Sequence, residues 1–358
     1  MSTLTDTAYY TRLSIKWGIV GIIVLFILKS LLTSAWDAWK AAHPPAPPPP
    51  TVSFGQLPIL KFPASSIKVT NLKFNLETIE GKPYIASDSA AVYFIPKPAP
   101  NLLALTRAEA FAARLNFKSE PTTNDKVIYH FVDSDLPSRT MDFNIVTNNF
   151  ELSYDYGSDL GVFAQKNLPS AAEAIMQAKN FLQNFSLYSD SLANGTEKIT
   201  FLSLSGNNLI PTTSFANADA IRVDLGRADL EDLKLFNDNP NEELVYFIFS
   251  GSSDQQKKIL KISYKFWPVE LEQRATYPLK SAETAWEELQ KGQGFIANVT
   301  QNQENPGAVT IRRMSLGFYY PSEYQEFLQP IYVFEGDPNF LGYVSAVNPN
   351  WVTQPSAK

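Results

Sequence analysis

The stretch LPSAAEAIMQAKNFL, residues 168–182, contains the clearest helix start in the chain. Ser170 and Glu173 match the S/T-x-x-E capping box, in which a hydroxyl and a carboxylate satisfy free amides at a helix N-terminus. Four apolar residues then recur at spacings of three and four: Ala174, Ile175, Ala178 and Leu182. Because this spacing places them on one helix face, we predict an amphipathic helix that packs on a sheet.

Two further stretches repeat this pattern. LTRAEAFAARLNF, residues 105–117, places Thr106 and Glu109 at the capping-box spacing. LKSAETAWEEL, residues 279–289, offers Ser281 as the N-cap. The apolar stripes of these two helices are predicted to be Ala110, Phe111 and Leu115 in the first, and Ala285, Trp286 and Leu289 in the second. The chain therefore predicts three similar helices.

Strand-like runs surround these helices. LSYDY at 152–156 and ISYKF at 262–266 each precede a helix start, and further alternating runs follow each helix as predicted antiparallel meanders. We predict an α+β fold with about three helix-on-antiparallel-sheet units. Their predicted ranges are 53–165, 166–268 and 269–352, with a tail at 353–358. Such units leave a sheet face or edge free for binding.

The N-terminal region contains an apolar run at 15–35, close to the ~20 residues that cross a hydrocarbon core. We predict a transmembrane helix there, after a short tail at 1–14. Trp17 and Trp36 flank it, as indole rings favour both membrane interfaces. Lys16 and Lys29 can extend towards the headgroups, and Lys29 can alternatively contact an acidic group on a partner helix.

A proline-rich linker is predicted at 36–52, with PPAPPPP at 44–50. Proline lacks the backbone donor and favours polyproline II, so this segment predicts a semi-rigid stalk, with an SH3-type ligand as the alternative. Arg12 and Lys16 crowd the short tail, which favours a cytoplasmic N-terminus and an extracytoplasmic C-terminal domain. The predicted location is the cell membrane, as a single-pass protein.

Composition excludes several classes of protein. The chain has no cysteine, which removes disulfides, thiolate nucleophiles and iron–sulfur clusters. Its formal net charge is −6, and the first 50 residues carry a surplus of two positive charges, so the remainder is more acidic still. We therefore predict no nucleic-acid binding, which depends on clustered Lys and Arg.

The sequence also lacks a motif that identifies a reaction. The only two histidines are His43, before the prolines, and His130, in a strand-like run that favours a histidine bonded in or beside a sheet. No G-x-S-x-G, phosphate-binding or H-E-x-x-H motif is present, and the acidic loop NDNPNEE at 237–243 lacks the order of a calcium site. We predict no catalytic residues, no cofactor, no metal and no small-molecule substrate.

The residues from LKSAETAWEELQKGQGFI through SLGFYYP, FLQPIYVFEGD and YVSAV resemble the C-terminal part of bacterial YycI-like and YycH-like extracytoplasmic regulators, and more distantly PepSY-type domains. The resemblance is clearest over 260–348. It implies a non-enzymatic envelope protein that acts through protein contacts, in that family on a sensor histidine kinase.

The sequence thus predicts a non-catalytic ectodomain on a membrane anchor that binds or regulates another envelope or membrane protein, such as a sensor kinase. The alternatives are an envelope hydrolase acting on glycan or peptide, and a structural tether or ligand-binding module.

Overall fold

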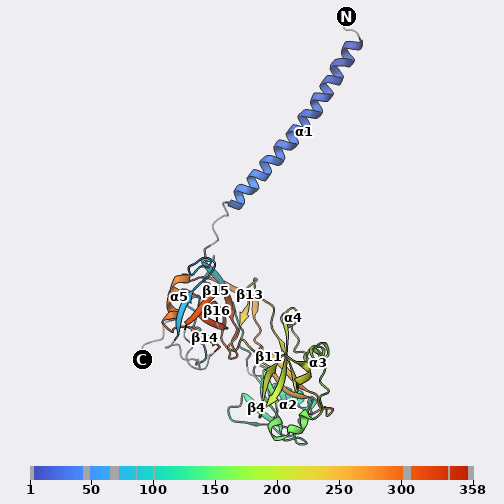
Figure 1. The fold of residues 1–358 in the computed structure, drawn as a ribbon, viewed down its shortest axis with the longest axis vertical. Helices are drawn as coiled ribbons and strands as arrows, with labels where there is room; N and C mark the ends of the chain where they lie inside the picture. The colour runs from blue at the N-terminus through green and yellow to red at the C-terminus, as the bar shows by residue number, and fades with distance from the viewer. Residues whose placement is uncertain are drawn as a thin grey trace. The chain divides into compact units, whose positions relative to one another are not determined.

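The computed structural model describes residues 4–42, 49–64, 72–85, 87–99, 101–300, 308–337 and 339–353. The chain divides into two compact units, Met1–Pro49 and Pro50–Lys358. It is a mixed α+β protein with an N-terminal apolar helix and a sheet-rich C-terminal body, as the sequence predicts (Figure 1).

The first unit contains a single long helix, α1 (Leu4–Ala42). It is longer than predicted, because residues assigned to the tail at 1–14 and to the linker at 36–52 continue the helix. The segment before the first proline, WDAWKAA, has no helix breaker, and Trp36 stacks on Trp39 with ring centroids 5.3 Å apart. Residues 44–48 of the predicted polyproline stalk lie outside the described residues.

Part of α1 is long and apolar enough to cross a membrane. The candidate span is Tyr9–Lys40, with a mean hydropathy of 2.2 in its most apolar window. Its length exceeds the ~20 residues required, so the helix can extend beyond the hydrocarbon core.

The second unit contains two sheets. The nine-stranded sheet is antiparallel throughout, in the order β3-β4-β5-β6-β12-β11-β9-β7-β8. Its strands are β3 (Thr122–Thr123), β4 (Ile128–Val132), β5 (Arg139–Asn144), β6 (Phe150–Tyr154), β7 (Glu197–Ser205), β8 (Asn208–Thr212), β9 (Ala220–Leu225), β11 (Val245–Ser250) and β12 (Ile259–Tyr264). Helices α2 (Ala104–Arg114) and α3 (Ala171–Asn184) share one hydrophobic cluster with it, and the short helix α4 (Asp190–Ala193) follows α3.

The two similar strands found in the sequence lie side by side at the centre of this sheet. LSYDY begins in β6 and ISYKF in β12, and these strands pair with Leu152 opposite Ile262. The predicted units 53–165 and 166–268 are therefore not separate, because this pairing joins their strands into one sheet. Their helices also meet, since the rings of Phe111 and Phe185 are 4.6 Å apart.

The helix starts follow the predictions at two of three sites. Ser170 and Glu173 form the full capping box of α3, and Ser281 caps α5 (Ala282–Gln290) by accepting from the Thr284 amide at 3.1 Å. The box predicted at Thr106 is wrong, because α2 begins two residues earlier at Ala104 and its N-cap makes no side-chain bond.

The buried faces of the three helices match the predicted stripes at every residue but one. The stripes predicted for α3 and α5 lie on the faces that pack against the sheets. In α2 the predicted Phe111 and Leu115 pack against the core beside the buried Ala108 and Ala112, whereas the predicted Ala110 is exposed. The Phe111 ring lies 5.1 Å from that of Phe143 and 5.0 Å from that of Phe150, both on the sheet.

The eight-stranded sheet is built from both ends of the second unit. Its main path is β1-β15-β16-β17-β14, with β2 pairing β13 and β16, and β10 pairing β15. The strands are β1 (Lys73–Leu76), β2 (Ser89–Phe94), β10 (Leu235–Phe236), β13 (Glu270–Pro278), β14 (Phe295–Asn298), β15 (Ala308–Tyr319), β16 (Phe327–Asp337) and β17 (Phe340–Ser345). Helix α5 packs on this sheet through Ala285 and Leu289. The chain just after position 53 was predicted to begin the first unit, but it pairs with the end of the third, because Leu57 forms a β-bridge with Val352.

Aromatic and polar contacts join the two sheets. The Arg227 guanidinium lies between the rings of Phe266 and Tyr320, 4.6 and 4.8 Å from their centroids, and donates to the Trp267 carbonyl at 2.7 Å. Tyr320 Oη donates to the same carbonyl at 3.0 Å. These contacts fix the chain where it leaves β12 and approaches the second sheet.

Candidate functional site

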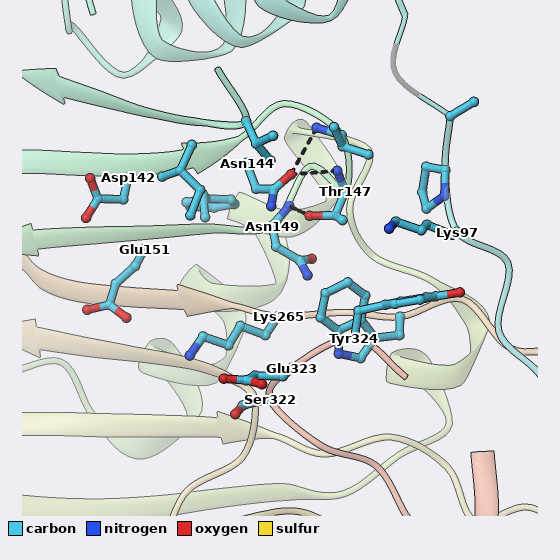
Figure 2. A pocket seen from close by; sticks show the side chains of 17 residues that line it. Lys97, Asp142, Asn144, Thr147, Asn149, Glu151, Lys265, Ser322, Glu323 and Tyr324 are labelled. Carbon is cyan, nitrogen blue, oxygen red and sulfur yellow. Dashed lines mark hydrogen bonds between the residues drawn. The ribbon is translucent and has the colours of Figure 1, made fainter. Parts of the chain in front are cut away.

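A groove of about 830 Å³ lies beside this junction (Figure 2). Four separate segments line it: residues 97–99 after β2, the β4–β6 meander, residues 265–267 after β12, and the loop 322–324. Its volume falls within the ~300–1,000 Å³ typical of ligand sites. The groove is the candidate binding site of the second unit.

One wall of the groove is aromatic. The ring of Tyr324 meets that of Trp267 edge-on, with centroids 5.6 Å apart, and Tyr324 Oη donates to the Ile95 carbonyl at 2.9 Å. Burial and the nearby Glu326 raise the pKa of Tyr324, so this hydroxyl stays protonated at neutral pH. Lys97 Nζ lies 5.7 Å from the Tyr324 ring centroid. The wall is therefore rigid, with a cation beside it.

The opposite wall comes from the β5–β6 hairpin and the start of β4. Asn144 Oδ1 accepts from the amides of Val146 and Thr147, both at 3.0 Å, and Asn148 takes the left-handed conformation with φ of +59°. Asparagine tolerates this region better than other non-glycine residues, which allows the tight turn. Ile128, 47% exposed, adds an apolar surface.

Asn149 lies under the centre of the groove and has an unmet donor. Its side chain is only 8% exposed. Oδ1 accepts from the Phe266 amide at 2.9 Å, which fixes the orientation of the side-chain amide. Nδ2 has no hydrogen-bond partner, and Figure 2 shows the side chain extending between Thr147 and Tyr324. A buried donor without an acceptor costs about 1–3 kcal/mol.

The charged side chains of the lining differ in how they are paired. Asp142 contacts His130 Nδ1 at 2.7 Å, and Glu151 pairs with Lys261 at 2.9 Å. Within the part of the chain that the structure describes, Lys97, Lys265 and Glu323 form no ion pair. Lys97, Lys265 and Glu323 are thus without an ion-pair partner, and the partner of Asp142 is a histidine, which is charged only when protonated.

The sequence-predicted membrane residues lie on α1. Trp17 and Trp36 are 69% and 57% exposed on the helix, and Lys40 Nζ lies 5.7 Å from the Trp36 ring centroid. Lys16 and Lys29 are also exposed on this helix. The contact predicted between Lys29 and a partner helix stays a prediction.

His130 confirms the prediction of a strand histidine bonded beside a sheet. It lies in β4 and bonds across to Asp142 in β5. His43 lies outside the described residues. The acidic loop at 237–243 has a structural role, because Asp238 accepts from Ser322 Oγ at 2.5 Å and Glu242 pairs with Arg222 at 2.8 Å.

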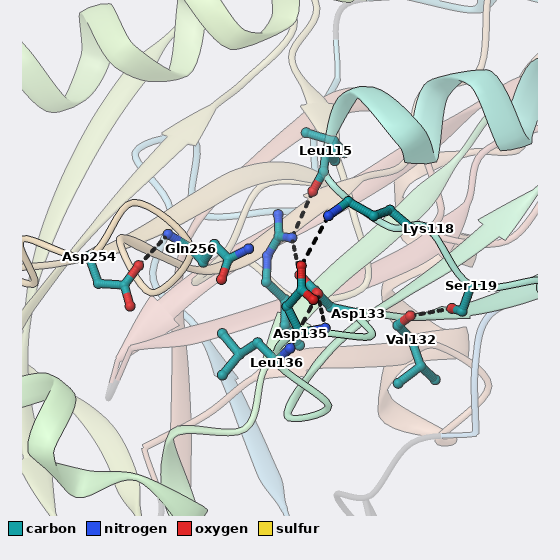
Figure 3. Close-up of polar contacts among 10 residues, drawn as sticks. Leu115, Lys118, Ser119, Val132, Asp133, Asp135, Leu136, Asp254 and Gln256 are labelled. Atoms are coloured by element: carbon teal, nitrogen blue, oxygen red, sulfur yellow. Dashed lines mark hydrogen bonds and ion pairs between the residues drawn. The ribbon is translucent and has the colours of Figure 1, made fainter.

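A second polar cluster lies beside the end of α2 and is buried (Figure 3). Arg139 pairs with the fully buried Asp133 at 3.1 Å and donates to the Leu115 carbonyl at 2.8 Å. Asp133 Oδ1 also accepts from the amides of Asp135 and Leu136. Arg139 Nε alone among these atoms is buried without a partner, and the bonds of the other atoms tie the end of α2 to the β4–β5 turn.

Sequence reasoning did not find the groove. Its lining comes from segments as far apart in the sequence as Lys97 and Tyr324, and no local motif marks them. The one local signal is TNN at 147–149, a hairpin-like connection between two strand-like runs, which places Asn149 at the turn.

No protein-family model matches the chain, and no curated protein matches it in sequence. Among solved structures, it is similar to an uncharacterized protein from Eubacterium rectale, with 13% identity, 76% of this chain and 87% of that chain covered, and a TM-score of 0.37. The Bacillus megaterium YpeB C-terminal domain shows 12% identity, covers 71% of this chain and 95% of its own, and gives a TM-score of 0.29. TM-scores of this size carry no fold assignment, and the resemblance to YycI-like, YycH-like and PepSY-type proteins stays a prediction.

Proposed function

We propose that this chain is a membrane-anchored, non-catalytic protein whose second unit binds an envelope protein outside the cytoplasm, with the groove as the contact site. The observation that carries the proposal is the groove itself, with an aromatic wall, an unmet amide donor and unpaired charges. The candidate span Tyr9–Lys40 supplies the anchor. A sensor kinase is one partner of this kind.

The side chains of the groove support binding over hydrolysis. Ser322 is the one serine of the lining, and its hydroxyl donates to Asp238. His130 is not part of the lining and makes no hydrogen bond to Ser322, so these two residues do not form a pair of nucleophile and base. Among the described residues, no group of His, Asp and Glu is arranged to hold a metal ion.

Photo-crosslinking in living cells tests the proposal. A photoreactive residue replaces Ile128 in the full-length chain, at the groove. The matched control is Ile210, which is 45% exposed against 47% for Ile128 and lies on β8 of the same sheet. We expect a discrete adduct with a membrane or envelope protein from position 128 alone. No adduct, or the same adducts from both positions, would contradict the proposal.

The orientation is tested separately. Because the chain has no cysteine, single cysteines at Arg12 and Gln56 report each side of the membrane without background. A membrane-impermeant maleimide added to intact cells should label Gln56→Cys and spare Arg12→Cys. The reverse pattern would place the second unit in the cytoplasm.

A further inference from the structure

We propose that a small cavity at the junction of the two sheets binds an oxyanion, a carboxylate or a phosphate group, at the Arg227 guanidinium. The cavity has a volume of about 240 Å³ and lies between the end of β9, β10, the start of β11 and the residues after β12. It shares only Lys265 with the groove, so it is a second site and the proposed function does not depend on it.

Arg227 is held in place but has no anionic partner. Its guanidinium lies between the rings of Phe266 and Tyr320, and Nη1 donates to the Trp267 carbonyl at 2.7 Å. It forms no ion pair with any residue that the structure describes. Nε is fully buried without an acceptor, whereas Nη2 also lacks an acceptor but is not fully buried. Nη2 is therefore the donor that a ligand meets.

An oxyanion supplies what this guanidinium lacks. Taking a guanidinium out of water without a counterion costs free energy, and contact with two aromatic rings compensates only part of that cost. The N–H groups of Nη2 are ionised donors, which form their strongest hydrogen bonds with carboxylate and phosphate oxygens. Because the rings already hold the side chain of Arg227, it loses little conformational entropy when an anion binds.

The charges of the cavity lining favour an anion. Three cations and two carboxylates line it, a surplus of one positive charge: Arg227, Lys234 and Lys265 against Asp229 and Glu243. Asp229 is exposed, and neither carboxylate forms an ion pair with a described residue. Burial and Asp224 raise the pKa of Glu243, and the cation that opposes this rise is Lys198, outside the lining. The two carboxylates thus leave the three cations without a counterion.

The size of the cavity limits the ligand. Its volume lies below the ~300–1,000 Å³ typical of sites for larger organic ligands. A phosphate ion, a small carboxylic acid or the carboxylate end of a longer molecule fits this space, whereas a folded peptide segment does not.

Equilibrium dialysis of the full-length protein in detergent tests the inference. Radiolabelled inorganic phosphate and radiolabelled acetate are measured separately at constant chloride concentration. We expect saturable binding of one anion per chain, with a Kd below about 1 mM for at least one of the two. The anion that binds more tightly tells whether the natural ligand presents a phosphate or a carboxylate.

Substitutions assign the binding to the cavity. Lys234→Gln changes an exposed residue of the lining and should weaken the anion about tenfold, since one charge-assisted contact is lost. Arg227→Gln should abolish saturable binding. Lys73→Gln, an exposed lysine on β1 outside the cavity, is the matched control and should leave binding unchanged. Because Arg227 also contacts both sheets, far-UV circular dichroism checks the fold, and Lys265→Gln with Lys234→Gln decides the matter if Arg227→Gln does not fold.

Two results would overturn the inference. One is the absence of saturable binding for both anions. The other is binding that Lys234→Gln and Lys265→Gln leave unchanged, or that Lys73→Gln weakens as much as they do, since general charge attraction would then explain it. The Ile128 crosslink is scored without either anion, so the proposed function is judged separately.

Discussion

Replacing Arg139 by methionine should destabilise the second unit more than any change of a surface charge. The substitution keeps an apolar side chain over the Phe117 ring, which lies 4.7 Å from the guanidinium, but leaves Asp133 fully buried without its cation. Breaking a buried ion pair costs about 3–5 kcal/mol. Because the amides of Asp135 and Leu136 still bond to the carboxylate, we expect the lower end, about 3 kcal/mol.

Urea unfolding of the full-length protein in detergent, followed by far-UV circular dichroism, measures this cost. Lys118→Met is the matched control from the same cluster (Figure 3), since its pair with Asp135 at 3.1 Å is mostly exposed. It should change the free energy of unfolding by less than about 0.5 kcal/mol. The double variant Asp133→Asn with Arg139→Met removes both charges and should recover much of the loss. An Arg139→Met cost no larger than that of Lys118→Met would refute the reasoning.

The remaining predictions concern charge, capping and packing. Burial and the neighbouring Asp224 raise the pKa of Glu243 in the folded protein. Protonation of Glu243 therefore stabilises the fold, fully so below the unfolded pKa of about 4.3. This stabilisation is lost as the pH rises through the folded pKa. Glu243→Gln should therefore raise the melting temperature at pH 7 and lose that advantage below about pH 4. Ser170→Ala removes the capping hydroxyl of α3 and should cost about 1 kcal/mol in urea unfolding, whereas Ser170→Asp should retain most of the stability. Leu182→Ala opens a cavity at a fully buried position and should cost about 2–5 kcal/mol, against a negligible change for the exposed Met176→Ala.

Local signals in the sequence predicted the elements better than their assembly. The α3 capping box and stripe are confirmed because both depend on residues within one or two helical turns. In α2 the predicted Phe111 and Leu115 pack against the core, and the prediction is wrong only at the exposed Ala110, because the smaller Ala108 and Ala112 complete the same buried face.

The assembly of the sheets depends on pairings between distant strands. The β6–β12 pairing places Leu152 opposite Ile262 and merges two predicted units. Each of these units was predicted to have a helix and strands of its own. The eight-stranded sheet likewise joins the two ends of the second unit, as the pairing of β1 with β15 shows, with Lys73 opposite Ala308. The groove arises where these assemblies meet, so no single stretch of sequence contains its pattern.

Amide hydrogen exchange tests the central claim, that a partner protein binds in the groove. The full-length chain is measured alone and with the protein recovered by the Ile128 crosslink, in the same detergent. We predict that added protection concentrates at 144–151 and 320–325, on both walls of the groove. Protection confined to β8 or α1, with both walls unchanged, would contradict the account.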